Sequence, residues 1–107
     1  MAIFLTNDNI NQYLEQSRTK PLIVDVYAEW CGPCKQMAPA FEELAKELSS
    51  QYNFAKINVD EESDLATKYK IRSVPTILFI KDEKVVATKV GAMTKETLKS
   101  EIERVFK

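Results

Sequence analysis

The stretch Trp30-Cys31-Gly32-Pro33-Cys34-Lys35 contains both cysteines of this 107-residue chain. It joins an apolar run at 22–27 to an amphipathic segment that starts at Pro33. The run predicts a strand and the segment predicts a helix. The first sulfur is then expected at a helix N-terminus, where unpaired N–H groups and the macrodipole favour an anion. A thiolate is such an anion and is the reactive form of cysteine, so the pattern indicates sulfur chemistry.

The residues between the two cysteines support the same interpretation. Gly32 lets the backbone turn and lets a partner approach closely. Pro33 presets a helical φ in the first turn, where its missing N–H costs nothing. Cys34 is expected about one turn after Cys31 on the same helix face, so the pair can close and open a small disulfide ring.

Three other interpretations of the cysteine pair compete with redox chemistry. A structural disulfide with so small a ring would remove little chain entropy and would stabilise the fold poorly. A zinc site needs four ligands, mostly Cys and His, whereas this chain has no His and no further Cys. Two inert thiols could lie in the core, but Gly-Pro on a turn is an unusual choice for core filling. Because Cys-x-x-Cys beside alternating strands and helices is a redox motif, we favour redox chemistry without a metal.

Length and composition predict a single globular domain over residues 1–107. Hydrophobic residues make up 45% of the chain and charged residues 29%, which is ordinary for a globular protein with its own core. A net charge of −1 without a basic run argues against nucleic acid or an anionic membrane as a partner. No stretch approaches the roughly 18 apolar residues of a membrane span, and no signal peptide is recognisable. We therefore expect a cytoplasmic protein, and in that reducing compartment a disulfide is usually transient and catalytic.

Strands and helices are expected to alternate along the chain. Apolar runs predict strands at 3–5, 22–27, 52–59, 77–80 and 84–90. Helical periodicity predicts a helix capped by Thr6 or Asn7, a long helix at 33–49, a short helix around 65–69 and a last helix capped by Thr94. The order β-α-β-α-β-α-β-β-α indicates an α/β domain whose central sheet is covered on both faces.

Two charged residues interrupt strands that are otherwise apolar. A carboxylate at Asp25 in a covered strand is unfavourable unless it is paired, or neutral through a raised pKa. From the residues alone, a solvent-facing or capping role for Asp25 is equally open. Lys56 interrupts the third strand, and a solvent-facing lysine is the simplest interpretation of it.

Three stretches resemble the thioredoxin family, and the similarity extends over essentially the whole chain. Residues 24–35, with Trp-Cys-Gly-Pro-Cys, resemble the family's active-site stretch. Residues 71–76 resemble the stretch around its cis-proline, and residues 89–92 resemble its third surface loop. The resemblance implies the thioredoxin fold, with a central mixed five-stranded sheet flanked by four helices.

The resemblance also implies a role for individual residues. Cys31, expected to be the more exposed sulfur, would be the nucleophile, and Cys34 would resolve the mixed disulfide. Asp25 becomes a buried proton acceptor behind Cys34, with Lys56 as the neighbour that tunes it. Pro75 is expected to be cis and packed beside the sulfurs. The apolar surface that receives substrate would consist of Trp30, Gly32, Pro33, Val59, Val74, Pro75, Gly91 and Ala92.

The function implied by these residues is that of a general protein disulfide reductase. It would keep protein thiols reduced and donate electrons to other reductases, acting as a monomer on disulfide-containing proteins. The redox group is the Cys31–Cys34 pair itself, with no metal or organic cofactor, and electrons would come from an NADPH-dependent thioredoxin reductase. Two alternatives stay open. One is a disulfide oxidase or isomerase of the same fold, and the other is a non-enzymatic interaction subunit that uses the Trp30/Pro75 surface.

The chain departs from the family pattern at a few places. The family often has glycine where this chain has Asp82-Glu83, Lys70 and Ser73, and Tyr27 stands where many members have Trp. These departures leave the turn geometry and the partner preference undetermined, while the cysteine motif is unaffected.

Overall fold

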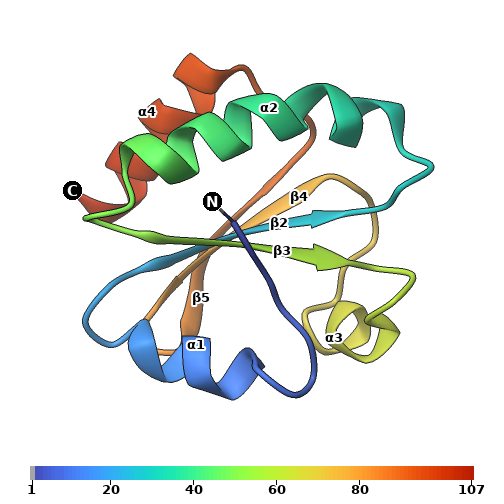
Figure 1. Cartoon of the computed structure of the whole chain (residues 1–107), viewed down its shortest axis with the longest axis horizontal. Helices are drawn as coiled ribbons and strands as arrows, with labels where there is room; N and C mark the ends of the chain where they lie inside the picture. Colours follow the sequence, from blue (N-terminus) through green and yellow to red (C-terminus); the bar gives the residue numbers. More distant parts are fainter. Residues whose placement is uncertain (1) are drawn as a thin grey trace.

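The computed structural model describes residues 2–107 as a central sheet with helices on both faces (Figure 1). The element order and the mixed five-stranded sheet are those expected from the sequence. The strands are β1 (Ile3–Phe4), β2 (Leu22–Tyr27), β3 (Asn53–Asn58), β4 (Thr76–Lys81) and β5 (Lys84–Val90). The helices are α1 (Ile10–Gln16), α2 (Gly32–Glu47), α3 (Ser63–Lys68) and α4 (Lys95–Phe106).

The strand order in the sheet is β1-β3-β2-β4-β5, so β2 is the central strand. The strands β1, β3 and β2 run parallel, whereas β4 pairs antiparallel with β2 and with β5. Helices α2 and α4 cover one face of the sheet, and α1 and α3 cover the other (Figure 1). A central strand covered on both faces needs apolar residues at nearly every position, which explains the composition of β2.

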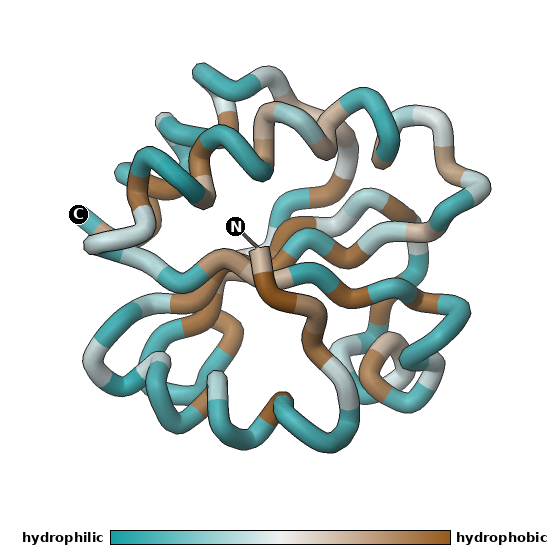
Figure 2. Tube along the Cα trace, in the orientation of Figure 1, coloured by the Kyte–Doolittle hydropathy of each residue, from teal (hydrophilic) through white to brown (hydrophobic). Residues whose placement is uncertain are grey.

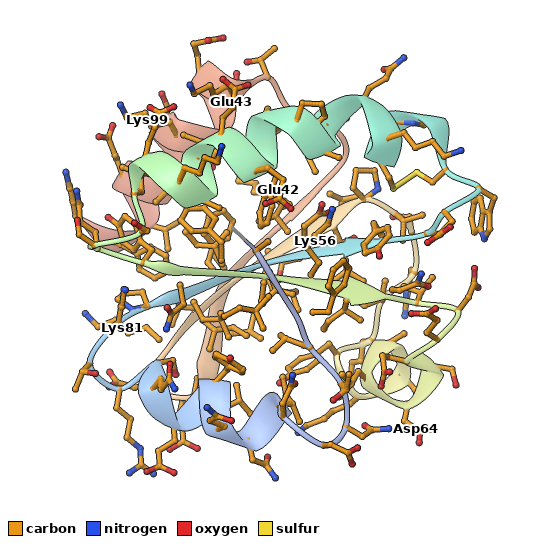
Figure 3. All side chains as sticks on the ribbon, in the orientation of Figure 1. Glu42, Glu43, Lys56, Asp64, Lys81 and Lys99 are labelled. Atoms are coloured by element: carbon orange, nitrogen blue, oxygen red, sulfur yellow. A yellow bond between two sulfur atoms is a disulfide. The ribbon has the colours of Figure 1, made fainter. Side chains whose placement is uncertain are left out.

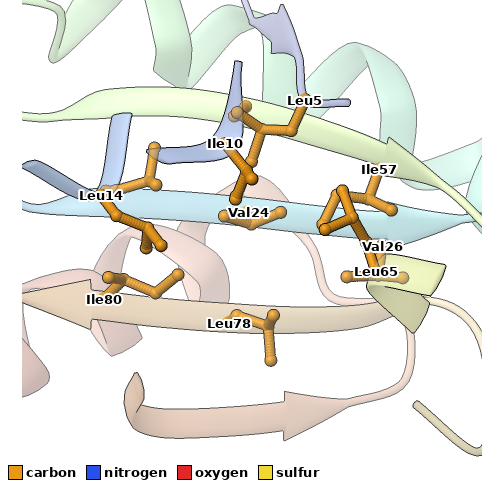
Figure 4. Close-up of a cluster of buried hydrophobic side chains, with 11 residues drawn as sticks. Leu5, Ile10, Leu14, Val24, Val26, Ile57, Leu65, Leu78 and Ile80 are labelled. Atoms are coloured by element: carbon orange, nitrogen blue, oxygen red, sulfur yellow. The ribbon is translucent and has the colours of Figure 1, made fainter. Parts of the chain in front are cut away.

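A separate hydrophobic cluster lies on each face of the sheet, and successive residues of β2 alternate between them. Val24 and Val26 belong to the cluster beneath α1 and α3 (Figure 4). Ile23 belongs to the cluster beneath α2 and α4, together with Phe41 and Phe79. Figure 2 shows the apolar residues concentrated along the strands and polar residues on the outer sides of the helices. The alternation places the Asp25 side chain on the α2 side of the sheet.

Helix α1 begins at Ile10 with Asn9 as its N-cap, so the expected start after Thr6 or Asn7 is wrong by about three residues. Thr6 is nevertheless engaged in a reciprocal pair of hydrogen bonds. Its N–H donates to Asn9 Oδ1 (2.8 Å), and the Asn9 N–H donates to Thr6 Oγ1 (3.2 Å). This pair has the pattern of a capping box and closes a turn before the regular helix begins. Thr6 therefore takes part in the turn that precedes the helix and is not its N-cap.

Three residues without glycine's freedom adopt left-handed backbone conformations. They are Lys70 (φ 56°), Asp82 (φ 52°) and Glu83 (φ 68°). Lys70 and the Asp82–Glu83 pair stand at two of the three places where the family often has glycine. Ser73 stands at the third place and does not have a left-handed backbone. The Asp82–Glu83 turn is held from outside by the end of α1. Ser17 accepts both turn N–H groups, that of Asp82 on its carbonyl (3.1 Å) and that of Glu83 on its hydroxyl (2.8 Å). These bonds, which are non-local, offset the unfavourable backbone conformation.

Replacing Lys70 by glycine should stabilise the fold. The side chain is exposed, and relief of the left-handed conformation outweighs the extra unfolded-state entropy by about 0.5–1 kcal/mol. Urea denaturation should give a higher free energy of unfolding for Lys70→Gly than for the parent protein. The matched control is Lys99→Gly, an exposed position inside α4, which should lose about 1 kcal/mol. A loss of stability in both variants would contradict the prediction.

Candidate redox site

The two cysteines lie at the N-terminus of α2 and are joined as a disulfide, with their Cα atoms 5.3 Å apart (Figure 3). Cys31 is the N-cap residue of the helix and has an extended backbone. Its Sγ accepts the backbone N–H of Cys34 at 3.2 Å. A backbone donor thus points at the first sulfur, and the same donor would stabilise a thiolate there after reduction.

Exposure separates the two cysteines less than expected. Cys31 is 5% exposed and Cys34 is 3% exposed, so both are nearly buried in the disulfide form. The order is the expected one, but so small a difference does not by itself identify the nucleophile. What distinguishes Cys31 is its place at the helix cap, where it receives the Cys34 N–H.

The loop before β4 closes the site from the opposite side. The Val74–Pro75 peptide bond is cis, as expected from the resemblance. The Val74 carbonyl oxygen lies 3.8 Å from Cys31 Sγ. The loop after β5 is tied to the same place, because the Gly91 N–H donates to the Pro75 carbonyl at 2.9 Å. Gly91 has φ +105°, a conformation that favours glycine.

The residues of the expected substrate surface are exposed or half-buried, except for Pro75, which is buried. Trp30 is 71% exposed, and the exposed and half-buried members around it are Gly32, Pro33, Val59, Val74, Gly91 and Ala92. Pro75 is buried, so it offers little area to the expected surface. A Cβ at Gly32 would meet no heavy atom within 4 Å, so neither the fold nor the local backbone requires glycine there. The open space leaves room for a partner.

A groove of about 430 Å³ extends this surface beyond the predicted residues. Trp30, Val59 and Val74, which belong to the expected substrate surface, line it. Its further lining residues, which sequence reasoning missed, are Ala66, Ile71, Arg72 and Ser73. Three of these belong to the 71–76 stretch that carried the resemblance, so the motif contained the information. Ala66 could not be found that way, because only the fold brings α3 to this place.

The exposed indole of Trp30 is held in place by Asp60, which was also missed. The Trp30 Nε1–H donates to Asp60 Oδ2 at 3.0 Å. Asn58, at the end of β3, accepts the N–H groups of Asp60 and Glu61 on its Oδ1 and so fixes the turn that carries Asp60. The sequence indicated only a solvated acidic turn here. The contact joins residues 30 positions apart and depends on the pairing of β2 with β3.

Asp25 is buried behind the cysteine pair. It is 1% exposed, and neither carboxylate oxygen has a hydrogen-bond partner among residues 2–107. Burial raises the pKa of Asp25 to about 6, with Lys56 lowering it and Glu42 raising it. Asp25, Cys34 and Lys56 all line one cleft of about 200 Å³. A carboxylate in this place can accept a proton near neutral pH.

Lys56 does not face solvent as the simplest interpretation of the sequence held. Its side chain is 12% exposed, and its Nζ lies 3.9 Å from Glu42 Oε2. The ammonium also lies 4.8 Å from the centroid of the Tyr27 ring. Lys56 is the β3 residue that pairs laterally with Asp25 of β2. It therefore shares the cleft with Asp25 while its charged end contacts Glu42 (Figure 3).

Within residues 2–107, no three His, Cys, Asp or Glu side chains are arranged to hold a metal ion. No helix in the same range has both the length and the apolar character of a membrane-spanning segment.

The thioredoxin family model matches residues 1–104. The chain is 51% identical to the thioredoxin of Rhodospirillum rubrum over 78 residues, which cover 73% of this chain and 75% of that protein. It is 43% identical to the thioredoxin of Acidithiobacillus ferridurans over 96 residues, covering 90% and 88% of the two chains. The X-ray structure of Fasciola hepatica thioredoxin is similar with a TM-score of 0.88 at 36% identity, covering 98% of this chain and 99% of that chain.

The pH dependence of stability should be dominated by Asp25. Its folded-state pKa of about 6 lies above the ordinary value of 3.8, so the folded state binds the proton more tightly. The contribution of Asp25 to the free energy of unfolding is therefore fully present below about pH 3.8 and is lost as pH rises through about 6. A rise in pKa from 3.8 to about 6 means that ionised Asp25 lowers the free energy of unfolding by about 3 kcal/mol relative to the neutral carboxyl group. Asp25→Asn removes this decline, so its stability relative to the parent should rise by about 2.5 kcal/mol between pH 4 and pH 8, because part of the decline has already occurred at pH 4.

Denaturation of the oxidised protein at pH 4, 6 and 8 measures this difference. Asp8→Asn removes the carboxylate of an exposed aspartate and is the matched control for the change in net charge. A stability difference between Asp25→Asn and the parent that is the same at pH 4 and pH 8 would rule out a raised pKa at Asp25.

Proposed function

Because the chain belongs to the thioredoxin family, we propose that it is a general protein disulfide reductase acting through Cys31 and Cys34. Membership of the family carries thiol–disulfide oxidoreductase activity in general. The finer proposal concerns the direction of exchange and the substrates, which are proteins with accessible disulfides. The observation that carries it is the cysteine pair at the α2 N-terminus, where the Cys34 N–H points at Cys31 Sγ.

The first step forms a mixed disulfide. In the reduced protein, the Cys31 thiolate attacks one sulfur of a substrate disulfide. The substrate S–S bond breaks, a new S–S bond joins Cys31 to the substrate, and the second substrate sulfur leaves as a thiolate that takes a proton from solvent. The backbone donor at Cys31 and the helix N-terminus favour the attacking anion.

The second step releases the reduced substrate. Cys34 gives its proton to Asp25, directly or through water, and its thiolate attacks Cys31 Sγ. The mixed disulfide breaks, the substrate sulfur leaves as a thiolate and takes a proton, and the Cys31–Cys34 disulfide forms. Two electrons have then passed from the cysteine pair to the substrate. The shared cleft of Asp25 and Cys34 supports this role for the carboxyl group.

The substrate is proposed to bind across the exposed face beside the cysteines. An extended segment would pair its backbone with Val74, in the manner of an added strand. Trp30, Gly32 and Pro33 are exposed around the disulfide, and the groove of about 430 Å³ offers room for an apolar side chain of the substrate. Ala92 and Gly91 would complete the surface on the other side of Val74.

The remaining parts of the proposal concern partners and place. Electrons are proposed to come from an NADPH-dependent thioredoxin reductase, which re-reduces the Cys31–Cys34 disulfide, so that no metal or organic cofactor is needed in this chain. We propose a monomer acting in the cytoplasm, where reduced protein thiols must be maintained.

The two alternative functions make different demands on the cysteine pair. A disulfide oxidase or isomerase would require a strongly oxidising pair, whereas a reductase requires one that is more reducing than glutathione. Titration of the Cys31–Cys34 couple against glutathione separates them. A non-enzymatic interaction subunit would use the face around Trp30 without electron transfer, and its function in cells would survive loss of both cysteines.

The roles of the two cysteines can be tested with trapping variants. Cys34→Ser lacks the resolving thiol and should accumulate a covalent mixed disulfide with a protein substrate such as insulin. Cys31→Ser lacks the nucleophile and should trap essentially none. Both variants should lose the ability to accelerate insulin reduction by dithiothreitol, measured as turbidity. Non-reducing gels that show equal trapping by both variants would refute the assigned roles.

A further inference from the structure

The cleft that contains Asp25 is bounded by α2 on one side and by β2 and β3 on the other. Ionisable groups line it from every one of these elements. They are Asp25, Tyr27 and Glu29 from β2 and the residues after it, Cys34 and Lys35 from α2, and Lys56 from β3. Glu42 of α2 lies next to the cleft, where its Oε2 is 3.9 Å from Lys56 Nζ. In the proposed exchange Cys34 attacks Cys31 Sγ, and Asp25 is the group of this cleft that accepts the Cys34 proton.

Lys56 is the cation best placed to pair with Asp25, yet it pairs elsewhere. The two residues are lateral neighbours on parallel strands, so their side chains leave the same face of the sheet. The Lys56 side chain is long and mostly buried in the cleft. Its ammonium nevertheless lies against Glu42 Oε2 and over the Tyr27 ring. Both Asp25 oxygens are left without a hydrogen-bond partner among residues 2–107.

Glu42 is itself fixed at the sheet-facing side of α2. Its Oε1 accepts the backbone N–H of Ala2 at 3.0 Å, which ties the start of the chain to the helix. Its other oxygen, Oε2, faces Lys56. Figure 3 shows Glu42 between α2 and the sheet, whereas its neighbour Glu43 lies on the opposite side of the helix. Glu42 can therefore hold Lys56 in one position.

We propose that Glu42 is a positioning residue for the exchange reaction, which binds the Lys56 ammonium and so keeps Asp25 free to accept the Cys34 proton. This inference rests on the proposed function in assigning Asp25 as the proton acceptor. Glu42, which lies on α2, thus joins Asp25 of β2 and Lys56 of β3 as a third residue that affects the proton transfer. The link runs from α2 through Lys56 to the carboxylate on β2.

The chemistry explains why such a residue is useful. An ion pair between Lys56 and Asp25 would stabilise the carboxylate and make it a weaker base, because an opposite charge lowers the pKa of an acid. A base is most effective when its pKa lies near the operating pH. Glu42 opposes the pairing by attracting the ammonium, and its own charge raises the pKa of Asp25.

The first test compares Glu42→Gln with Glu43→Gln. Glutamine keeps an oxygen that can accept the Ala2 N–H, so the fold should be preserved while the charge is lost. Glu43 is exposed and pairs with Lys95, away from the cleft, and its substitution changes net charge equally. Carbon-13 NMR of the Asp25 carboxyl in the oxidised protein follows its titration. The midpoint should fall by about 0.5–1 pH unit in Glu42→Gln and stay unchanged in Glu43→Gln.

A second pair of variants separates positioning from simple charge repulsion. Lys56→Met removes the cation and should raise the Asp25 midpoint. In the Lys56→Met background, Glu42→Gln should shift the midpoint by less than half of its effect in the parent, because the intermediate group is gone. A full effect in that background would show direct repulsion alone and would overturn the positioning role. Equal midpoints for Glu42→Gln and Glu43→Gln would overturn the inference altogether.

The kinetic consequence is confined to the second step of exchange. Release of substrate from a preformed Cys31 mixed disulfide should slow several-fold at pH 7–8 in Glu42→Gln, and formation of that disulfide should be unaffected. A shifted NMR midpoint with unchanged release would show that Glu42 does not position groups for the reaction. The NMR measurement uses no substrate, so a protein that failed to reduce insulin would reject the proposed function without altering this titration.

Discussion

Burial of the central strand β2 on both faces is the constraint on which the site depends. The strand must be apolar to lie between two helical layers, and it ends at the point where the chain turns into α2. The cysteine pair therefore follows directly after the central strand of the sheet. The single carboxylate in β2 is carried into the interior by the same constraint, because its neighbours at 24 and 26 occupy the other face. Position and altered acidity of Asp25 follow from one cause.

The site itself is assembled from segments that are distant in the sequence. The α2 N-terminus provides the sulfurs, the loop before β4 provides the carbonyl next to Cys31, and the loop after β5 is bonded to that loop through Gly91. The pairing of β2 with β4 and of β4 with β5 brings these three segments together at one end of the strands. A partner at this end of the sheet would meet polar backbone groups at the centre and apolar side chains around them. Such a surface suits extended segments of varied sequence, because backbone pairing is insensitive to side-chain identity.

Features with a local cause could be predicted from the sequence, and those with a distant cause could not. The apolar run at 22–27, the fifth strand and the Thr94 cap were located to the residue, since periodicity and capping chemistry are local. The cis bond before Pro75 came from family resemblance, because residue type alone rarely implies it. The place of Lys56 beside Asp25 was expected only from the family resemblance, whereas its contact with Glu42 of α2 could not be predicted from local pattern. The left-handed turn at 82–83 depends on Ser17, whose role no turn rule could supply.

Trp30 is the only tryptophan of the chain, and its ring is anchored to Asp60 next to the cysteine pair. All indole fluorescence of the molecule therefore originates at one place, within one residue of Cys31. Emission from a ring that is 71% exposed is sensitive to the water around it. The protein thus carries an intrinsic optical reporter at its working surface, and both closure of the disulfide and coverage by a partner can be followed without attaching a dye.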